Sequence, residues 1–407
     1  MRTKTFHYRL RRLCAFIIGV VFLLAGLFKL LDPVGAGLVV EEYLRFMHLR
    51  FLMPGAKGIG VSMALLESLL GAAMISGVWR KPVAILTSIM IIFFTILTLF
   101  LAVFNPAMDC GCFGEVIHLT NFQTFLKNLV LLVLMLIAFM PYKDFGRTRK
   151  RKYVAFLIVA ASIAAFTVYS LKNIPMVDYT AFTPGSELLA SKSNEPDENA
   201  GRPRVIYEKN GQEGVFDLDK LPDSTWTFVR TEDIAVNGPE LDDNVPILSF
   251  YDSLDVYCDE KAAEGNAMVV SVYDTDKMKG DAWTRISELL DGASAAGFTP
   301  LLLASTTKED FDSLEVIVPE VMEKLVPSLY FADYKTLVSL NRSNGGATWF
   351  SDGQLIEKYP ASKLPSGEKM LQMTGDDPTE SMLRTSTKSR IRFQGFLLYV
   401  FAILLLV

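Results

Sequence analysis

The sequence predicts a membrane bundle of α-helices joined to a soluble α/β domain. Residues 13–170 are dominated by Leu, Ile, Val, Phe and Ala, whereas residues 171–390 carry about 38 acidic against about 21 basic side chains. The whole chain of 407 residues has a net charge of −5, so its apolar part is basic. The basic residues stand at the edges of apolar segments and not in an aromatic-rich surface patch, which argues against nucleic acid as a partner.

Five apolar segments of about 20 residues are long enough to cross a bilayer as helices. They lie at about residues 13–31, 58–78, 82–104, 122–141 and 153–170. A sixth segment, 393–407, is short for a full crossing, and we expect it to be interfacial, tilted or incomplete. The first segment is too long for a signal peptide and lacks a cleavage site, so we expect a retained helix.

Clusters of Lys and Arg predict the orientation of these helices. They precede the first segment and fill the connections after the second and fourth, so all of them fall on one side if every segment crosses. That side is expected to be the cytoplasm. The large acidic domain then lies in the periplasm of a bacterium, outside its inner membrane. In the outward connection 32–57, apolar residues at near-helical spacing predict an amphipathic helix on the membrane surface.

The motif DCGCFGE lies in the outward loop between the third and fourth segments. Cys110 and Cys112 face an oxidising compartment, and Gly111 allows the bend that a disulfide between them needs. Such a ring is strained and easily reduced, which favours redox catalysis, although Asp109 disfavours a thiolate. A structural turn and a metal-binding thiol pair are the alternatives. We expect no metal, because two thiolates need further ligands and only His118 is near.

Glu67 lies near the middle of the second segment, where an ionisable group is expensive and marks a candidate functional site. Lys29, near the outer end of the first segment, is its expected partner, unless its side chain extends to the membrane surface. Two roles are open for Glu67: quinone or proton handling together with Lys29, or a structural hydrogen bond between helices. Cys14 is expected to be an ordinary buried thiol, and Cys258 either a buried thiol or an exchange partner of the loop cysteines.

A family resemblance follows from the succession GLFKLLDP, EEYL, LLESLLGAAMISG, CGCFG and KNLVLLVL. Over about residues 10–142 the chain resembles the membrane family that includes DoxX proteins and the methylamine-utilisation protein MauE. The resemblance implies a four-helix bundle similar to quinone-coupled disulfide-forming proteins, to which the segment at 153–171 and the sixth segment would be added. It also implies thiol and quinone redox chemistry, with Cys110 and Cys112 at the active loop.

The outward part begins with residues 172–245, which are rich in Pro, Gly, Ser, Asn and acids and predict a linker with a small β-hairpin, RVIYEKNGQEGVFDL. Over residues 246–365, strands and helices alternate and end in a hairpin with Asp-Gly at its turn, which predicts an α/β layer. This order resembles the thioredoxin fold. The sequence DTDKMKGDAW stands where that fold carries CxxC, and RSNGGATW where it carries a cis-proline. We therefore expect this domain to bind or dock without thiol chemistry of its own.

Two hypotheses follow for the function. In the first, the chain is a membrane thiol:quinone-type oxidoreductase or disulfide relay, in which Cys110, Cys112 and Glu67 carry the chemistry. In the second, it is a non-catalytic membrane subunit or assembly factor whose periplasmic domain binds a partner protein. The lipid bilayer is the expected environment in both, and a membrane quinone is the expected cofactor in the first.

Overall fold

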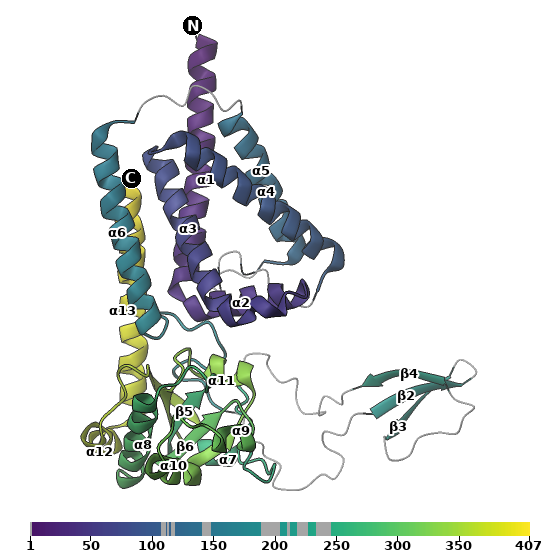
Figure 1. Ribbon diagram of the computed structural model, residues 1–407, viewed down its shortest axis with the longest axis vertical. Coiled ribbons are helices and arrows are strands. Elements are labelled where there is room, and N and C mark those ends of the chain that lie inside the picture. The colour runs from purple at the N-terminus through teal and green to yellow at the C-terminus, as the bar shows by residue number, and fades with distance from the viewer. Residues whose placement is uncertain are drawn as a thin grey trace.

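A computed structural model of the chain describes residues 2–106, 111, 114, 119–140, 148–188, 204–209, 212–217, 227–232 and 246–407. Within these residues the chain forms a bundle of long helices, a mixed α/β module and a separate antiparallel sheet. Figure 1 shows the bundle above the module, with helix α2 (Pro33–Phe46) crossing the end of the bundle that faces the module.

In the part of the chain that the structure describes, six helices are long and apolar enough to cross a membrane. They are α1 (Arg2–Leu31), α3 (Ala56–Ser76), α4 (Arg80–Phe104), α5 (Asn121–Phe139), α6 (Lys150–Lys172) and α13 (Pro378–Leu406). These helices confirm the predicted helical membrane bundle. The last one corrects the short segment predicted at 393–407, because α13 begins at Pro378. The first half of α13 is polar, so a search for apolar segments does not detect it.

The connection 32–57 forms α2 and a short 3-10 helix, η1 (Arg50–Gly55), which confirms the predicted helix. Asp32 caps α2, because its Oδ1 accepts hydrogen bonds from Val34 N (3.2 Å) and Gly35 N (2.9 Å). Phe51 is 77% exposed, as expected for an apolar side chain at a membrane surface.

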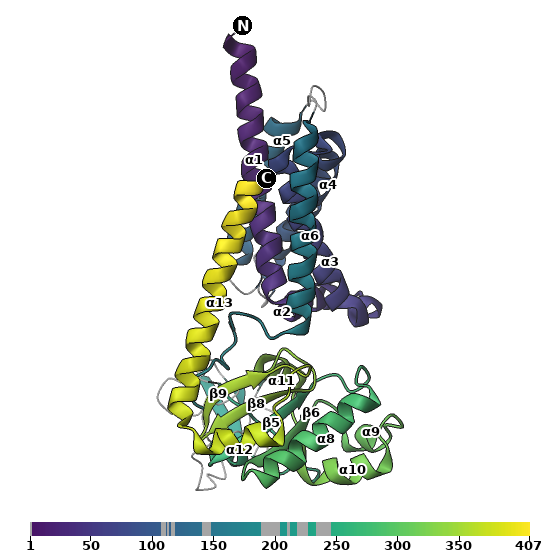
Figure 2. The ribbon, with the colours of Figure 1, turned by 90° about the vertical axis from the view of Figure 1, so that its left-hand side faces the viewer.

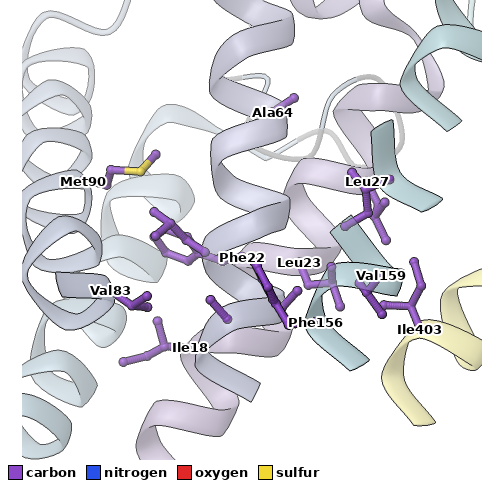
Figure 3. Packing of buried hydrophobic residues seen from close by; sticks show 14 of the residues in the cluster. Ile18, Phe22, Leu23, Leu27, Ala64, Val83, Met90, Phe156, Val159 and Ile403 are labelled. Carbon is purple, nitrogen blue, oxygen red and sulfur yellow. The ribbon is translucent and has the colours of Figure 1, made fainter. Parts of the chain in front are cut away.

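Glycines allow α1 and α3 to pack closely against each other. A Cβ added at Gly71 would lie 2.6 Å from Gly19 O, and one added at Gly26 would lie 2.6 Å from Ser68 N. Small residues at such contacts are typical of membrane helix pairs. Buried apolar side chains from α1, α3, α4, α6 and α13 fill the core around this contact. Figure 3 labels Ile18, Phe22, Leu23, Leu27, Ala64, Val83, Met90, Phe156, Val159 and Ile403.

Gly71→Ala is expected to lower the free energy of unfolding by about 1–3 kcal/mol, because the new methyl group overpacks the contact between α1 and α3. Thermal unfolding of the full chain in one detergent measures the effect. The matched control is Gly58→Ala in the same helix, where an added Cβ meets nothing within 4 Å. This control should be neutral or stabilising by up to about 1 kcal/mol, since Ala is the better helix former. Equal melting temperatures for the two variants would contradict the close packing.

The predicted basic clusters gather at one end of the bundle. Arg11 Nε donates a hydrogen bond to Ala138 O (3.0 Å), and Thr148 Oγ1 donates one to Gly77 O. These bonds place the start of α1 beside the end of α5, and the start of α6 beside the end of α3. Arg80 begins α4 immediately after α3. The helix α2 and the module lie at the opposite end, as Figure 1 shows. The prediction that the basic clusters share one side is therefore confirmed in the fold.

The module is built on a mixed sheet that, in the described residues, has five strands in the order β7-β6-β5-β8-β9. The strands are β5 (Asn266–Val272), β6 (Thr299–Ala304), β7 (Leu329–Phe331), β8 (Gly346–Ser351) and β9 (Gln354–Tyr359). The first three run parallel, and β8 is antiparallel to both β5 and β9. Asp352 and Gly353 join β8 to β9 with φ values of 47° and 77°, as an Asp-Gly hairpin turn requires.

Helices cover both faces of this sheet, and each face has its own core. Alternate residues of β5 point to opposite faces, so Met268 packs with α8 (Gly280–Ala295) and α12 (Gly367–Gly375), while Val269 packs with α7 (Glu260–Ala263) and α11 (Tyr334–Leu340). The remaining helices are α9 (Lys308–Asp312), α10 (Pro319–Leu325) and the 3-10 helix η2 (Val326–Ser328). Pro319 begins α10, a position where its missing N–H costs no helical hydrogen bond.

The predicted linker is partly ordered structure. Its hairpin strands are present as β2 (Arg204–Lys209) and β3 (Gln212–Asp217), and β4 (Thr227–Glu232), which was not predicted, pairs with β2. Residues 183–188 line the edge of the module, because Gly185 N donates to Leu355 O (2.7 Å) and Leu188 N donates to Gly353 O (2.8 Å). The module therefore includes the beginning of the predicted linker.

Candidate functional site

The predicted partners Glu67 and Lys29 form an ion pair inside the bundle. Lys29 Nζ lies 2.8 Å from Glu67 Oε1 and 2.7 Å from Oε2, and the two side chains are 14% and 5% exposed. The α1–α3 contact brings them together, since Lys29 stands one turn beyond Gly26 and Glu67 directly precedes Ser68. Lys29 therefore points to Glu67 and not to the membrane surface. Each of the two buried charges offsets the cost of removing the other from water.

Side chains from α4 and α5 complete the surroundings of this ion pair. Lys29 Nζ lies 5.8 Å from the centre of the Phe94 ring, within the range of a cation–π interaction. Asn128 Nδ2 donates hydrogen bonds to Thr98 Oγ1 (3.1 Å) and Phe94 O (3.3 Å). Asn128 was not predicted as a site residue, although an amide side chain in an apolar helix indicates a hydrogen bond between helices.

A cavity of about 40 Å³ adjoins the ion pair, lined by Glu67, Lys29, Phe94, Lys127, Asn128 and aliphatic side chains. Pockets for cofactors and drug-sized ligands hold about 300–1,000 Å³, so this cavity does not fit a quinone ring. It has room for one or a few water molecules, for which the polar lining offers partners. The predicted membrane quinone stays a prediction.

The two loop cysteines, Cys110 and Cys112, lie outside the described residues, as does His118. Their neighbours Gly111 and Gly114 are described, and they have φ values of 55° and 61°. Gly114 N donates a hydrogen bond to Gly111 O (3.1 Å), which closes a tight turn. Gly111 therefore has a left-handed backbone, which glycine adopts at little cost, and the predicted disulfide bend between the two cysteines stays a prediction.

This turn lies beside the backbone of Lys29 on α1 and beside α2. A Cβ added at Gly114 would lie 3.5 Å from Lys29 Cα, and one added at Gly111 would lie 2.7 Å from Val39 Cγ2 on α2. Gly111 is partly exposed and Gly114 is buried. The structure thus brings the loop that contains Gly111 and Gly114 next to the helix that carries Lys29.

The module docks on the end of the bundle opposite the basic clusters, through a second buried ion pair. Arg342 Nε lies 2.9 Å from Asp32 Oδ2, with side chains 6% and 8% exposed, and Lys335 Nζ lies 3.2 Å from Glu42 Oε1 at the rim. Tyr273 at the end of β5 donates its hydroxyl proton to Arg342 O (3.0 Å), and burial raises the pKa of this tyrosine. Nothing in the sequence pattern indicated these contacts between distant segments.

Residues at the ends of β5 and α11 and the loop before β8 form the module's side of this contact. Asn344 Oδ1 accepts hydrogen bonds from Tyr273 N (2.9 Å) and Asp274 N (3.1 Å), which ties the segment after β5 to the loop before β8. Two cavities of about 240 and 100 Å³ remain between module and bundle, and both are lined by Lys57, Tyr273 and Asn344. The segment after β5 and the loop before β8 are therefore docking segments.

The other two cysteines are structural. Cys14 and Cys258 are free thiols, buried at 4% and 6% exposure. Cys258 Sγ donates a hydrogen bond to Val256 O (3.4 Å), and burial raises the pKa of its thiol. A buried thiol with a raised pKa is a poor nucleophile. Of the two interpretations of Cys258, the structure favours the buried, unreactive thiol.

Comparisons with known proteins agree with the membrane part of this description. Residues 8–141 match the model of the family described as Methylamine utilisation protein MauE. Residues 203–237 match a domain of unknown function, DUF8463. No curated protein and no solved structure matches the chain. Together with the six apolar helices found in the described residues, the first match indicates a multi-pass membrane protein with a MauE-like helical bundle.

Proposed function

We propose that this chain is a membrane thiol–disulfide oxidoreductase that acts through Cys110 and Cys112. One observation carries the proposal: the glycine between the two cysteines has the left-handed backbone of a tight turn, and this turn packs against the backbone of Lys29, whose side chain is paired with the buried Glu67. A short, strained disulfide ring on such a turn is easily reduced, and it can form again on oxidation. The similarity to the MauE family over residues 8–141 supports the same assignment.

The proposed step is an exchange between the Cys110–Cys112 disulfide and a dithiol of a partner protein. One partner thiolate attacks a sulfur of the disulfide, which forms a mixed disulfide and releases the other loop cysteine as a thiolate. The second partner thiolate then breaks the mixed disulfide. The partner leaves with a new disulfide, and Cys110 and Cys112 keep the two electrons and two protons as thiols. The loop is oxidised again by a two-electron acceptor, such as the disulfide of a second protein, which takes up the electrons as its own thiols form. We assign the transfer of the two released protons to Glu67, paired with Lys29.

The orientation of the chain supports access to an oxidising compartment. The basic clusters lie at one end of the bundle, and Gly111, α2 and the module lie at the other. By the positive-inside rule the basic end faces the cytoplasm. We therefore place the loop and the module on the periplasmic side of a bacterial inner membrane.

We assign the module a docking role on a thioredoxin-like scaffold. Its strand order, with a parallel pair next to an antiparallel hairpin and helices on both faces, supports this scaffold. The segments that would carry CxxC and the cis-proline contact the bundle instead, through Arg342, Asn344 and Tyr273. By docking, the module holds α2 in place, and Gly111 packs against this helix.

A stoichiometric titration tests the proposed function. The oxidised full-length protein in lipid nanodiscs is mixed with a reduced dithiol peptide, and the peptide thiols lost per chain are counted. We expect about one dithiol oxidised per chain, and none with Cys110→Ser or Cys112→Ser, because each removes one sulfur of the disulfide. The matched control, Cys14→Ser with Cys258→Ser, removes the two buried thiols and should leave the count unchanged. Equal counts for all variants would refute the proposal.

A further inference from the structure

Helix α13 connects the module to the membrane bundle. Its second half packs in the bundle core through the buried residues Phe396, Val400 and Ile403, and the Phe396 ring stacks on Phe166 of α6 with centroids 5.4 Å apart. Its first half extends from the bundle to the module, as Figure 2 shows. The helix therefore passes through one membrane surface on the side of the module.

The level of that membrane surface on α13 follows from its contacts with α6. Tyr399 lies beside Ser162 inside the apolar part, with their hydroxyl oxygens 3.3 Å apart. Ser389 donates a hydrogen bond to Met176 O, which comes just after α6 ends at Lys172. The residues around 389 consequently stand where the lipid headgroups begin.

A cationic groove occupies this level of α13. It is lined by residues one turn apart on one face of the helix: Glu380, Leu383, Arg384, Thr387, Lys388, Ile391 and Arg392. Arg384 is paired with Glu380 at 2.7 Å. Lys388 and Arg392 are exposed and form no ion pair within the described residues. Two like charges at positions i and i+4 repel each other along the helix, so a bound anion between them would stabilise it.

We propose that the groove around Lys388 and Arg392 binds the phosphate headgroup of an anionic phospholipid, in the membrane leaflet on the side of the module. The two cations match the phosphodiester in charge, and they stand at headgroup level. Ile391, which is 62% exposed on the same face, offers an apolar contact to the lipid beside its headgroup. This partner also explains cations at the outer end of a membrane helix, where the positive-inside rule disfavours them.

Lipid retention tests the proposal. The full-length protein is purified from nanodiscs made of phosphatidylcholine with or without phosphatidylglycerol, and the lipids that remain bound are counted by native mass spectrometry. We expect the wild type to retain phosphatidylglycerol in preference to phosphatidylcholine. Lys388→Gln with Arg392→Gln should reduce this preference roughly 25-fold, since each cation near an anionic surface contributes about fivefold.

The matched control is Lys279→Gln with Lys308→Gln, which removes the same charge from exposed lysines of the module. It should keep the preference of the wild type. An undiminished preference in the Lys388 and Arg392 variant would overturn the proposal, and so would an equal loss in the control, which would indicate a response to net charge alone. If the variant loses its monodisperse elution, Lys388→Met with Arg392→Met replaces it, because methionine keeps most of the aliphatic stems that cover the helix.

Discussion

Glu67→Leu is expected to lower the free energy of unfolding by about 3–5 kcal/mol, because it leaves the Lys29 ammonium buried without its counter-charge. Lys29 is only 14% exposed, and its nitrogen lies within 2.8 Å of both carboxylate oxygens, so water cannot easily replace them. The loss is measured as the shift of the thermal unfolding transition of the full chain in one detergent.

The control for this prediction is the double variant Lys29→Met with Glu67→Leu. Replacing both members of a buried pair with apolar residues of similar size is often nearly neutral, so the double variant should recover most of the lost stability. Lys29→Met alone should be destabilised like Glu67→Leu. If the two single effects simply add in the double variant, the two side chains do not interact, contrary to the structure.

Arg342→Met is expected to release the module from the bundle. The change leaves the Asp32 carboxylate buried at the contact without its counter-ion, and breaking such a pair costs about 3–5 kcal/mol. A zero-length carbodiimide cross-link measures docking, because Lys335 and Glu42 lie 3.2 Å apart across the contact. The wild type should give this cross-link, and Arg342→Met should give little or none.

Two controls separate undocking from unfolding. Lys324 and Asp291 lie 3.0 Å apart within the module, so their cross-link should persist in Arg342→Met. Asp32→Asn should also abolish the Lys335–Glu42 cross-link, while an asparagine at this position still caps α2. A cross-link that survives in both Arg342→Met and Asp32→Asn would contradict the docking role of this ion pair.

The membrane helices and the ion pair could be predicted because their physical signals are local. An apolar run of about 20 residues has few alternatives to a membrane helix, and a charge inside such a run requires a partner. Glu67 has Lys29 as the nearest candidate in the preceding helix, and the pair forms. The strands of the module were also predictable, since their alternation and the Asp-Gly turn are local patterns.

The contacts between distant segments could not be predicted in this way. Asp32 and Arg342 are separated by most of the chain, and nothing in their surroundings in the sequence signals that they meet. The first half of α13 was not predicted as a helix, because its polar residues resemble a loop when only hydropathy is considered. The nearness of Gly114 to Lys29 depends on how a loop folds back on the bundle, which periodicity does not encode.

The redox state of Cys110 and Cys112 in cells tests the central claim most directly. Free thiols of the full-length protein are first blocked with one alkylating reagent, and thiols released by reduction are then labelled with a second, heavier one. We expect Cys110 and Cys112 to carry mainly the second label, as a reversible disulfide in an oxidising compartment requires. Cys14 and Cys258, which are free thiols, should carry only the first label once the chain is unfolded for labelling. Finding Cys110 and Cys112 with only the first label would contradict the account.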